Sequence, residues 1–248
     1  PYEGFWKQYA TTGVDFLRAQ GYIDFGFSES ISAQLGFGKH FVGNGMRSLI
    51  LSDYSNNYPY LRINTETKVF DYTNIFAELI AGVRGGTFGL EGTGGFQKKY
   101  MAFHHLNMKI KSNLHIGLFE SVMYGDSTGG LKVEYLNPII FYRAVEQQNG
   151  SEDNALIGLD FKWDIKNRVS LYGQLVIDEM VVSEVFNGNG WWGNKQGFQL
   201  GAKYVDAFGL ENLLIQGEIN RVRPYMYAHE DGFTSYTHYN LALAHPLG

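Results

Sequence analysis

The chain contains no cysteine and only 5 prolines among its 248 residues. The absence of cysteine fits a protein of the oxidising cell envelope, where stray disulfides must be avoided. Charged residues make up 18% of the chain, fewer than in a typical soluble domain, whereas aromatic residues reach 16%. Because disordered chains are poor in aromatic residues and rich in proline and charge, this composition excludes a disordered protein.

The sequence also lacks long runs of apolar or basic residues. Its apolar runs, such as 49–51 and 180–182, are far shorter than the about 18 to 20 residues that a transmembrane helix needs. A helical membrane protein is therefore excluded, but a membrane β-barrel is not, because only every second residue of its strands faces lipid. The net charge is -5 and the longest basic run is Lys98-Lys99, which argues against nucleic acid as a partner.

What the sequence does have is a two-residue alternation of apolar and polar side chains, repeated about ten times. In 154–164, for example, Leu159 and Phe161 share one face while Asp160 and Lys162 lie on the other. Successive side chains of a strand point to opposite faces, so each such segment predicts a strand with one apolar and one polar side. The expected strands are 16–27, 31–39, 59–65, 69–83, 100–111, 114–124, 154–164, 169–182, 197–205 and 213–223.

The connections between the expected strands alternate between short and long. Turns such as 28–30 and 112–113 are short, whereas links such as 40–58, 84–99 and 125–153 are long. Outer-membrane β-barrels have tight turns at the periplasmic rim and longer loops outside the cell. The sequence therefore predicts an all-β, antiparallel, transmembrane outer-membrane β-barrel, with residues 1–248 forming a single domain that is incomplete at one or both ends.

In such a barrel the apolar faces point outward to lipid and the polar faces point into the lumen. Glu120 shares a face with Leu118, so its carboxylate would point toward lipid. A bulge near Gly117, or a position of Glu120 at the rim, would avoid this. Several aromatic residues lie near the expected strand ends, where they could form girdles at the membrane interface or take part in ordinary strand packing. They are Trp163, Tyr172, Tyr204, Trp191 and Trp192. The polar residues expected to point inward should form a network of ion pairs and hydrogen bonds. They are Arg18, Gln20, Asp24, Gln34, Glu78, His105, Lys109, Asp160, Lys162, Gln174, Asp178, Lys203, Gln216, Glu218 and Asn220.

Two segments, expected to be extracellular loops, carry residue types that suit a ligand. Trp191, Trp192 and Asn194 lie in a Gly-rich loop, and flat indoles with amide donors suit sugar rings. An anchoring pair of tryptophans at the membrane interface is the competing interpretation. In the second segment the side chains of Arg221, Arg223 and Tyr225 could bind anionic lipopolysaccharide or an acidic saccharide, or form a structural salt link.

The sequence predicts no catalytic residue, metal or cofactor. Residues 125–129 match the G-x-S-x-G pattern of serine hydrolases, but no helical pattern follows them, which favours a flexible loop. A lipid or ester hydrolase with Ser127 as nucleophile is a minor alternative. The histidines show no ligand spacing, and His104 and His105, adjacent on one strand, point to opposite faces.

Segment 43–59, Gly-Asn-Gly-Met-Arg-Ser-Leu-Ile-Leu-Ser-Asp-Tyr-Ser-Asn-Asn-Tyr-Pro, resembles a stretch of the Wzi-like capsule-assembly outer-membrane proteins. In that family a Gly-rich turn leads into a Ser-Leu-Ile-Leu-Ser run and then a proline. The resemblance is closer to the Bacteroidota branch that includes the gliding-motility protein RemB. Further similar segments are 137–143, 153–156, 172–175, 190–195, 221–225, 238–240 and 244–248. The resemblance implies a larger outer-membrane barrel, of which this chain is a part, and a role in surface polysaccharide attachment or in gliding.

The leading hypothesis is a non-enzymatic protein of the bacterial outer membrane, with extracellular loops, that binds or organises surface polysaccharide or supports gliding motility. The alternative is a passive pore or a structural subunit of a larger cell-envelope complex. The expected partners are outer-membrane lipid and lipopolysaccharide, surface polysaccharide and other envelope proteins.

Overall fold

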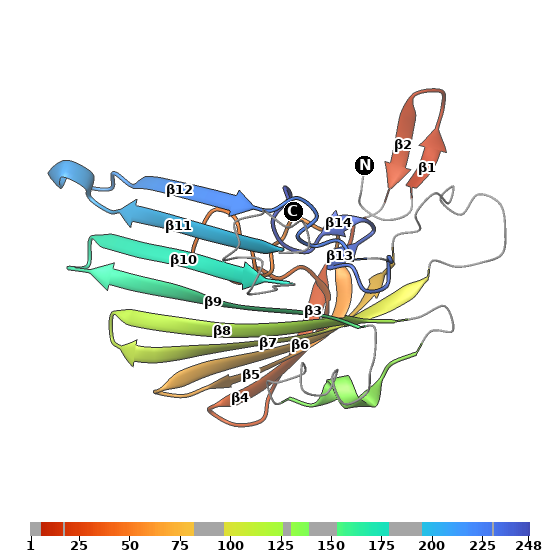
Figure 1. The fold of residues 1–248 in the computed structure, drawn as a ribbon, viewed down its shortest axis with the longest axis horizontal. Coiled ribbons are helices and arrows are strands. Elements are labelled where there is room, and N and C mark those ends of the chain that lie inside the picture. Colours follow the sequence, from red (N-terminus) through yellow and green to blue (C-terminus); the bar gives the residue numbers. More distant parts are fainter. Residues whose placement is uncertain are drawn as a thin grey trace, which may run out of the picture.

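The computed structural model describes residues 6–16, 18–81, 97–125, 130–138, 153–178, 195–229 and 231–248. Ten strands form one antiparallel sheet, in which strands that follow one another in sequence are also neighbours in space (Figure 1). The expectation of an all-β chain with an antiparallel sheet is confirmed. In chain order the ten strands are β3 (Gly21–Gly26), β4 (Ile31–Gly38), β5 (Tyr58–Glu66), β6 (Phe70–Ile80), β7 (Lys98–Lys111), β8 (Leu114–Tyr124), β9 (Asn154–Ile165), β10 (Val169–Ile177), β11 (Gln196–Tyr204) and β12 (Ile215–Val222).

Two small hairpins and two short helices accompany the sheet. They are the pairs β1 (Trp6–Tyr9) with β2 (Gly13–Phe16) and β13 (Thr237–His238) with β14 (Leu241–Ala242), and the 3-10 helices η1 (Val133–Leu136) and η2 (Ala207–Gly209). Among the residues that the structure describes, no helix is long and apolar enough to cross a membrane. In the same residues β3 and β12 each pair with a single neighbour, so both edges of the sheet are unpaired.

The strand expected over 16–27 is divided in two. β2 ends at Phe16 and β3 begins only at Gly21, so that Arg18 and Gln20 precede the sheet instead of facing its interior. In place of strand pairing, this segment makes hydrogen bonds with the side chain of Asn57. The Asn57 amide nitrogen donates to the carbonyl of Ala19 at 2.8 Å, and the Gln20 amide nitrogen donates to the side-chain oxygen of Asn57 at 3.0 Å.

All short connections lie at one end of the sheet. This short-turn end holds the turns that join β3 to β4, β5 to β6, β7 to β8 and β9 to β10, together with the connection 205–214 that contains η2 (Figure 1). At the opposite end, which we call the long-link end, residues 39–57 join β4 to β5. The two ends of the sheet therefore differ in the length of their connections.

The face of the sheet that we call outer exposes large apolar side chains. Residues directly opposite one another on paired strands share a face, and Leu118, Leu159, Leu175 and Phe198 form one such row across four strands. The exposed apolar residues of this face are Ile23, Phe25, Ile31, Leu35, Phe37, Leu61, Leu118, Leu159, Trp163, Leu175, Phe198, Leu200, Ile215 and Ile219. The alternation of the sequence predicted this apolar face correctly.

The inner face is covered by two segments at the long-link end. The sheet curls around the inserted loop (residues 39–57) and the C-terminal segment (residues 223–248) in Figure 1. Both contribute to the main hydrophobic core: the side chains of Leu49, Ile50 and Leu51 are fully buried. The long link expected over 40–58 folds back against the inner face, because three consecutive apolar side chains gain more from burial against the sheet than from exposure to water.

Two other side chains lie on the opposite face from that expected. Glu78 was expected to point inward, but it lies opposite Tyr100 on the outer face and pairs with Lys98 at 2.8 Å. The inner positions on either side of it, Ala77 and Leu79, belong to the core. Tyr172, a candidate for the interfacial girdle, faces inward instead, where its hydroxyl donates to Glu218 at 2.9 Å.

Glu120 shares the outer face with Leu118, as the alternation indicates, yet it is only 4% exposed. Residues 130–138 cover the outer face in this region. The ring of Tyr135 packs 4.6 Å from that of Tyr124, and the hydroxyl of Tyr72 donates to the carbonyl of Pro138 at 2.7 Å. The strand shows no bulge near Gly117: the register shift between β7 and β8 lies at Lys109–Lys111. The carboxylate is thus buried on the outer face, in the region that residues 130–138 cover.

Candidate functional site

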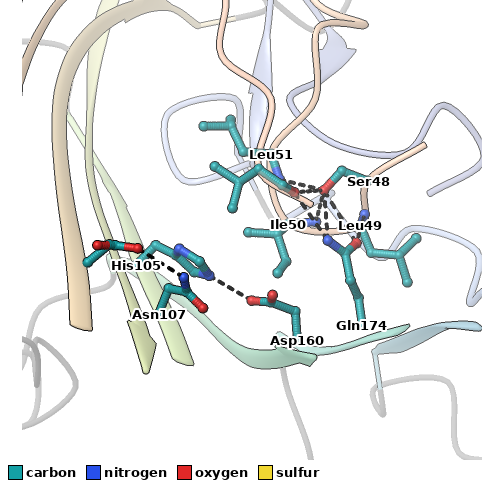
Figure 2. Close-up of polar contacts among 10 residues, drawn as sticks. Ser48, Leu49, Ile50, Leu51, His105, Asn107, Asp160 and Gln174 are labelled. Atoms are coloured by element: carbon teal, nitrogen blue, oxygen red, sulfur yellow. Dashed lines mark hydrogen bonds and ion pairs between the residues drawn. The ribbon is translucent and has the colours of Figure 1, made fainter. Parts of the chain in front are cut away.

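Three side chains from three adjacent strands hold the inserted loop against the inner face. They are Gln174 of β10, Gln199 of β11 and Glu218 of β12, and strand alternation directs all three inward. Figure 2 shows Gln174 reaching the backbone of the loop. We call this set, with the loop residues 42–51 that it contacts, the loop clasp.

Glu218 binds the loop through its carboxylate. The backbone N–H groups of Met46 and Arg47 donate to it at 2.7 and 3.3 Å, and the amide of Asn220 donates to it at 2.7 Å. Gly45 permits this close approach, because a Cβ at that position would meet the carboxylate and would force the Glu218 side chain to shift. A charged acceptor with several donors makes the stronger kind of hydrogen bond, so Glu218 fixes both the position and the conformation of residues 45–47.

Gln174 and Ser48 organise the next part of the loop. Gln174 accepts the backbone N–H of Leu49 at 2.7 Å and donates to the carbonyl of Val42 at 3.1 Å. The hydroxyl of Ser48 also donates to Val42 and accepts the backbone N–H groups of Ile50 and Leu51 at 3.1 and 3.2 Å. Ser48 is fully buried. Its contacts are those of a hydroxyl that shapes a turn, because they satisfy backbone groups that would otherwise be unpaired in the core.

Toward the short-turn end the inner face is polar. His105 of β7 and Asp160 of β9 approach to 2.6 Å (Figure 2). Gly117 of β8 lies between them, and a Cβ there would collide with both side chains. Lys109, also on β7, pairs with Asp71 of β6 at 2.6 Å. These contacts pair polar and charged groups on the inner face, as the network interpretation of the sequence expected.

The C-terminal segment is held by buried histidine and lysine side chains. The ring of His238 accepts the backbone N–H of Ile80 at 3.0 Å through Nδ1, and its Nε2 lies 3.1 Å from the carbonyl of Asn57. His40 of the inserted loop packs edge-on against Tyr60, with ring centroids 4.2 Å apart. Burial lowers the pKa of both His238 and His40 from the usual 6.5 to about 4. Nδ1 of His238 must therefore remain unprotonated to keep the contact with Ile80.

The sequence-predicted site residues are distributed over different parts of the molecule. Arg221 lies on the outer face of β12, opposite Phe198, and is exposed. Arg223 follows the strand, and its backbone N–H donates to the carbonyl of Gln196. Tyr225 has a left-handed backbone, with φ of 62°, and its side chain is 74% exposed. The other predicted residues, Trp191, Trp192, Asn194 and Ser127, lie outside the described residues.

The sequence analysis did not identify the loop clasp as a unit. Gln174 and Glu218 were expected to face inward, but their partners in the inserted loop were not predicted. The available signals were the pair Gly43 and Gly45, which permit close approach, and the apolar run that follows Ser48. Among the described residues, no group of three or more His, Cys, Asp or Glu side chains could hold a metal ion. No family model, curated protein or solved structure matches this chain.

Replacing Glu218 with alanine should loosen the inserted loop. The N–H groups of Met46 and Arg47 lose their acceptor, which we expect to lower the free energy of unfolding by about 2 kcal/mol. Trypsin should then cleave faster after the exposed Arg47, as measured by mass spectrometry of the fragments. The control is Gln216→Ala on the same face of β12, because this amide donates to Tyr172 and not to the loop. Equal cleavage rates in the two variants would contradict the role of Glu218.

Acidification should weaken the attachment of both covering segments. Since the folded pKa of His40 and of His238 is about 4 and the ordinary value is 6.5, the unfolded chain takes up these protons first as the pH falls. Stability is therefore complete above pH 6.5, decreases toward pH 4, and loses about 2 kcal/mol per histidine by pH 5. Urea titrations at pH 7 and pH 5 measure this loss. In His238→Gln the loss of stability between pH 7 and pH 5 should be smaller by the contribution of one histidine. If the loss is the same as in the parent protein, protonation of His238 does not weaken the fold.

Proposed function

We propose that this chain is part of a bacterial outer-membrane β-barrel whose outer face contacts lipid and whose extracellular end is closed by the inserted loop and the C-terminal segment. In this proposal the protein is not an enzyme. It binds or organises surface polysaccharide, or supports gliding motility.

The observation that carries the membrane proposal is that the sheet exposes apolar side chains on its outer face and buries polar side chains on its inner face, the opposite of a water-soluble protein. Apolar side chains such as Leu159 and Leu200 are 40% and 56% exposed on the outer face, while the inner Asp160, Gln174 and Gln199 are buried. A water-soluble protein rarely exposes an apolar surface that extends across many strands. Transfer of each large apolar side chain from water to hydrocarbon stabilises by about 1.5 to 3 kcal/mol. Lipid is the solvent that suits such a face.

The two unpaired edges complete this argument. In hydrocarbon, each unpaired backbone group costs several kcal/mol, so an open sheet edge cannot face lipid. The proposal therefore requires additional strands that pair with β3 and β12 and close the sheet. A larger barrel is also what the resemblance to Wzi-like and RemB-like proteins implies.

The covered inner face favours a surface protein over a passive pore. At the long-link end the inserted loop and the C-terminal segment fill the space beside the inner face with the main apolar core. An ion path needs a continuous hydrated lumen. Conductance in planar bilayers tests this choice: we expect no steady open channel, and a stable ohmic conductance would favour the pore.

Vesicle insertion of the complete polypeptide tests the membrane proposal. We expect it to acquire strand structure in vesicles of phosphatidylethanolamine and phosphatidylglycerol, measured by circular dichroism, and to aggregate in buffer without detergent. A folded, monodisperse protein in plain buffer would refute the proposal.

Binding of an acidic capsular polysaccharide to the same vesicles tests the surface role. Tyr225 is exposed just beyond β12, at the long-link end. Its replacement with alanine should weaken binding, whereas Tyr9→Ala, at a tyrosine that is 72% exposed in the β1–β2 hairpin, should not. If both variants bind like the parent protein, this site does not contact the polysaccharide.

A further inference from the structure

The connection between β11 and β12, residues 205–214, differs from the four other connections at the short-turn end. Those turns consist mainly of Ser, Glu, Thr, Lys, Asn and Arg, and each of them exposes at most one large apolar side chain, Phe27 (71%) in one and Val69 (68%) in another. In the 205–214 connection, in contrast, four large apolar side chains are exposed: Val205 (46%), Phe208 (79%), Leu210 (60%) and Leu214 (55%). The segment contains no lysine or arginine.

This connection is a folded unit. Its backbone is closed internally: the N–H of Ala207 donates to the carbonyl of Leu213 at 3.0 Å, and the N–H of Leu210 donates to that of Ala207 at 3.1 Å. The carboxylate of Asp206 accepts the N–H of Asn212 at 2.9 Å. Its backbone groups therefore need little water, which is the condition for placing a non-strand segment next to lipid.

Backbone strain presents the apolar side chains outward. Asp206 and Phe208 have φ of 49° and 57°, in the left-handed region that non-glycine residues rarely adopt. This conformation buries the small Ala207 and leaves Phe208 as the most exposed large apolar side chain of the connection. Strained conformations of this kind persist only where surrounding contacts enforce them, and here the hydrogen bonds of Asp206 and Ala207 do so.

The exposed side chains continue the outer face. Phe208 contacts Tyr204 edge-on, with ring centroids 5.8 Å apart. Tyr204 belongs to the outer face, on the same side of β11 as Phe198 and Leu200. Aromatic side chains at the end of an apolar face are typical of the boundary between headgroups and acyl chains.

We propose that residues 205–214 form an interfacial anchor, which places Phe208, Leu210 and Leu214 at the headgroup–acyl boundary of the leaflet at the short-turn end. This inference rests on the proposed function, because it requires the outer face to contact lipid. The occupant is lipid, since the exposed side chains are continuous with the outer face. The anchor would fix the depth of the edge of the sheet in the bilayer.

Single-cysteine labelling tests the anchor, because the chain has no cysteine of its own. The complete polypeptide carrying Phe208→Cys, labelled with an environment-sensitive fluorophore, is inserted into vesicles of phosphatidylethanolamine and phosphatidylglycerol that contain nitroxide lipids. Leu210→Cys is a second reporter. Leu200→Cys marks the middle of the outer face, and Asn167→Cys marks the exposed polar turn between β9 and β10 at the same end.

We expect Phe208 and Leu210 labels to be quenched by nitroxides near the headgroup and to lose quenching by aqueous iodide, relative to the Asn167 label. The Leu200 label should be quenched by nitroxides in the acyl chains. Iodide quenching of the Phe208 and Leu210 labels equal to that at Asn167 would overturn the anchor while the outer face remains in lipid. Protection from both quenchers would also overturn it, because a protein contact then covers the connection. Iodide quenching at Leu200 would instead refute the membrane proposal itself.

Discussion

A Leu159→Arg variant should lose most of its insertion into lipid vesicles. Leu159 lies in the middle of β9 on the outer face, opposite Leu118 on one side and Leu175 on the other. An arginine near the centre of a bilayer costs a membrane barrel about 2 to 4 kcal/mol. If water contacted this face, the same substitution at a side chain that is 40% exposed would change stability by only about 0.5 kcal/mol. The fraction of polypeptide protected from protease by vesicles measures the difference.

Two controls separate the effect of charge from that of the substitution. Leu159→Phe keeps the position apolar and should insert like the parent protein. Ser170→Arg places the same charge on the inner face of β10, opposite Asp164, and should also insert normally. Normal insertion of Leu159→Arg would show that the outer face does not contact lipid.

The strands were predictable because their pattern is local. β8 spans the predicted residues 114–124, and the alternation around Leu159 identified the apolar face before any contact was known. Because residues two apart on a strand share a face, strand alternation alone also assigns Arg221 to the outer face with Ile219. Arg221 was predicted to be a loop residue on its charge alone, although it lies within the expected strand 213–223.

The covering segments were not predictable from the same pattern. Gln174 accepts the N–H of Leu49 across 125 positions of the sequence, and Tyr236 donates to the carbonyl of Ile50 across 186. Such contacts depend on where the sheet brings distant segments together, and no spacing rule encodes that. An apolar run between polar residues, as at 49–51, indicates burial but not against which surface.

A Lys99→Met variant should destabilise the C-terminal segment more than any exposed substitution. Lys99 is fully buried on the inner face of β7, and its ammonium group donates to the carbonyls of Gly232 and Ser235 at 2.8 and 2.7 Å and to the hydroxyl of Thr237 at 3.1 Å. Methionine fills a similar volume but donates no hydrogen bond. The buried carbonyl of Ser235 and the half-buried carbonyl of Gly232 then lose their donor, which we expect to lower the free energy of unfolding by about 3 kcal/mol.

The neighbouring Lys98 provides the matched control. It lies on the outer face and pairs with Glu78 at 2.8 Å, with more than half of its side chain exposed. A solvent-exposed ion pair contributes about 0 to 1 kcal/mol, so Lys98→Met should have little effect. Urea unfolding measures both variants, and hydrogen exchange at Tyr236, whose N–H donates to the carbonyl of Tyr227, reports on the segment itself. Because adjacent strand residues face opposite sides, equal losses in the two variants would mean that the ammonium group of Lys99 does not hold the C-terminal segment in place.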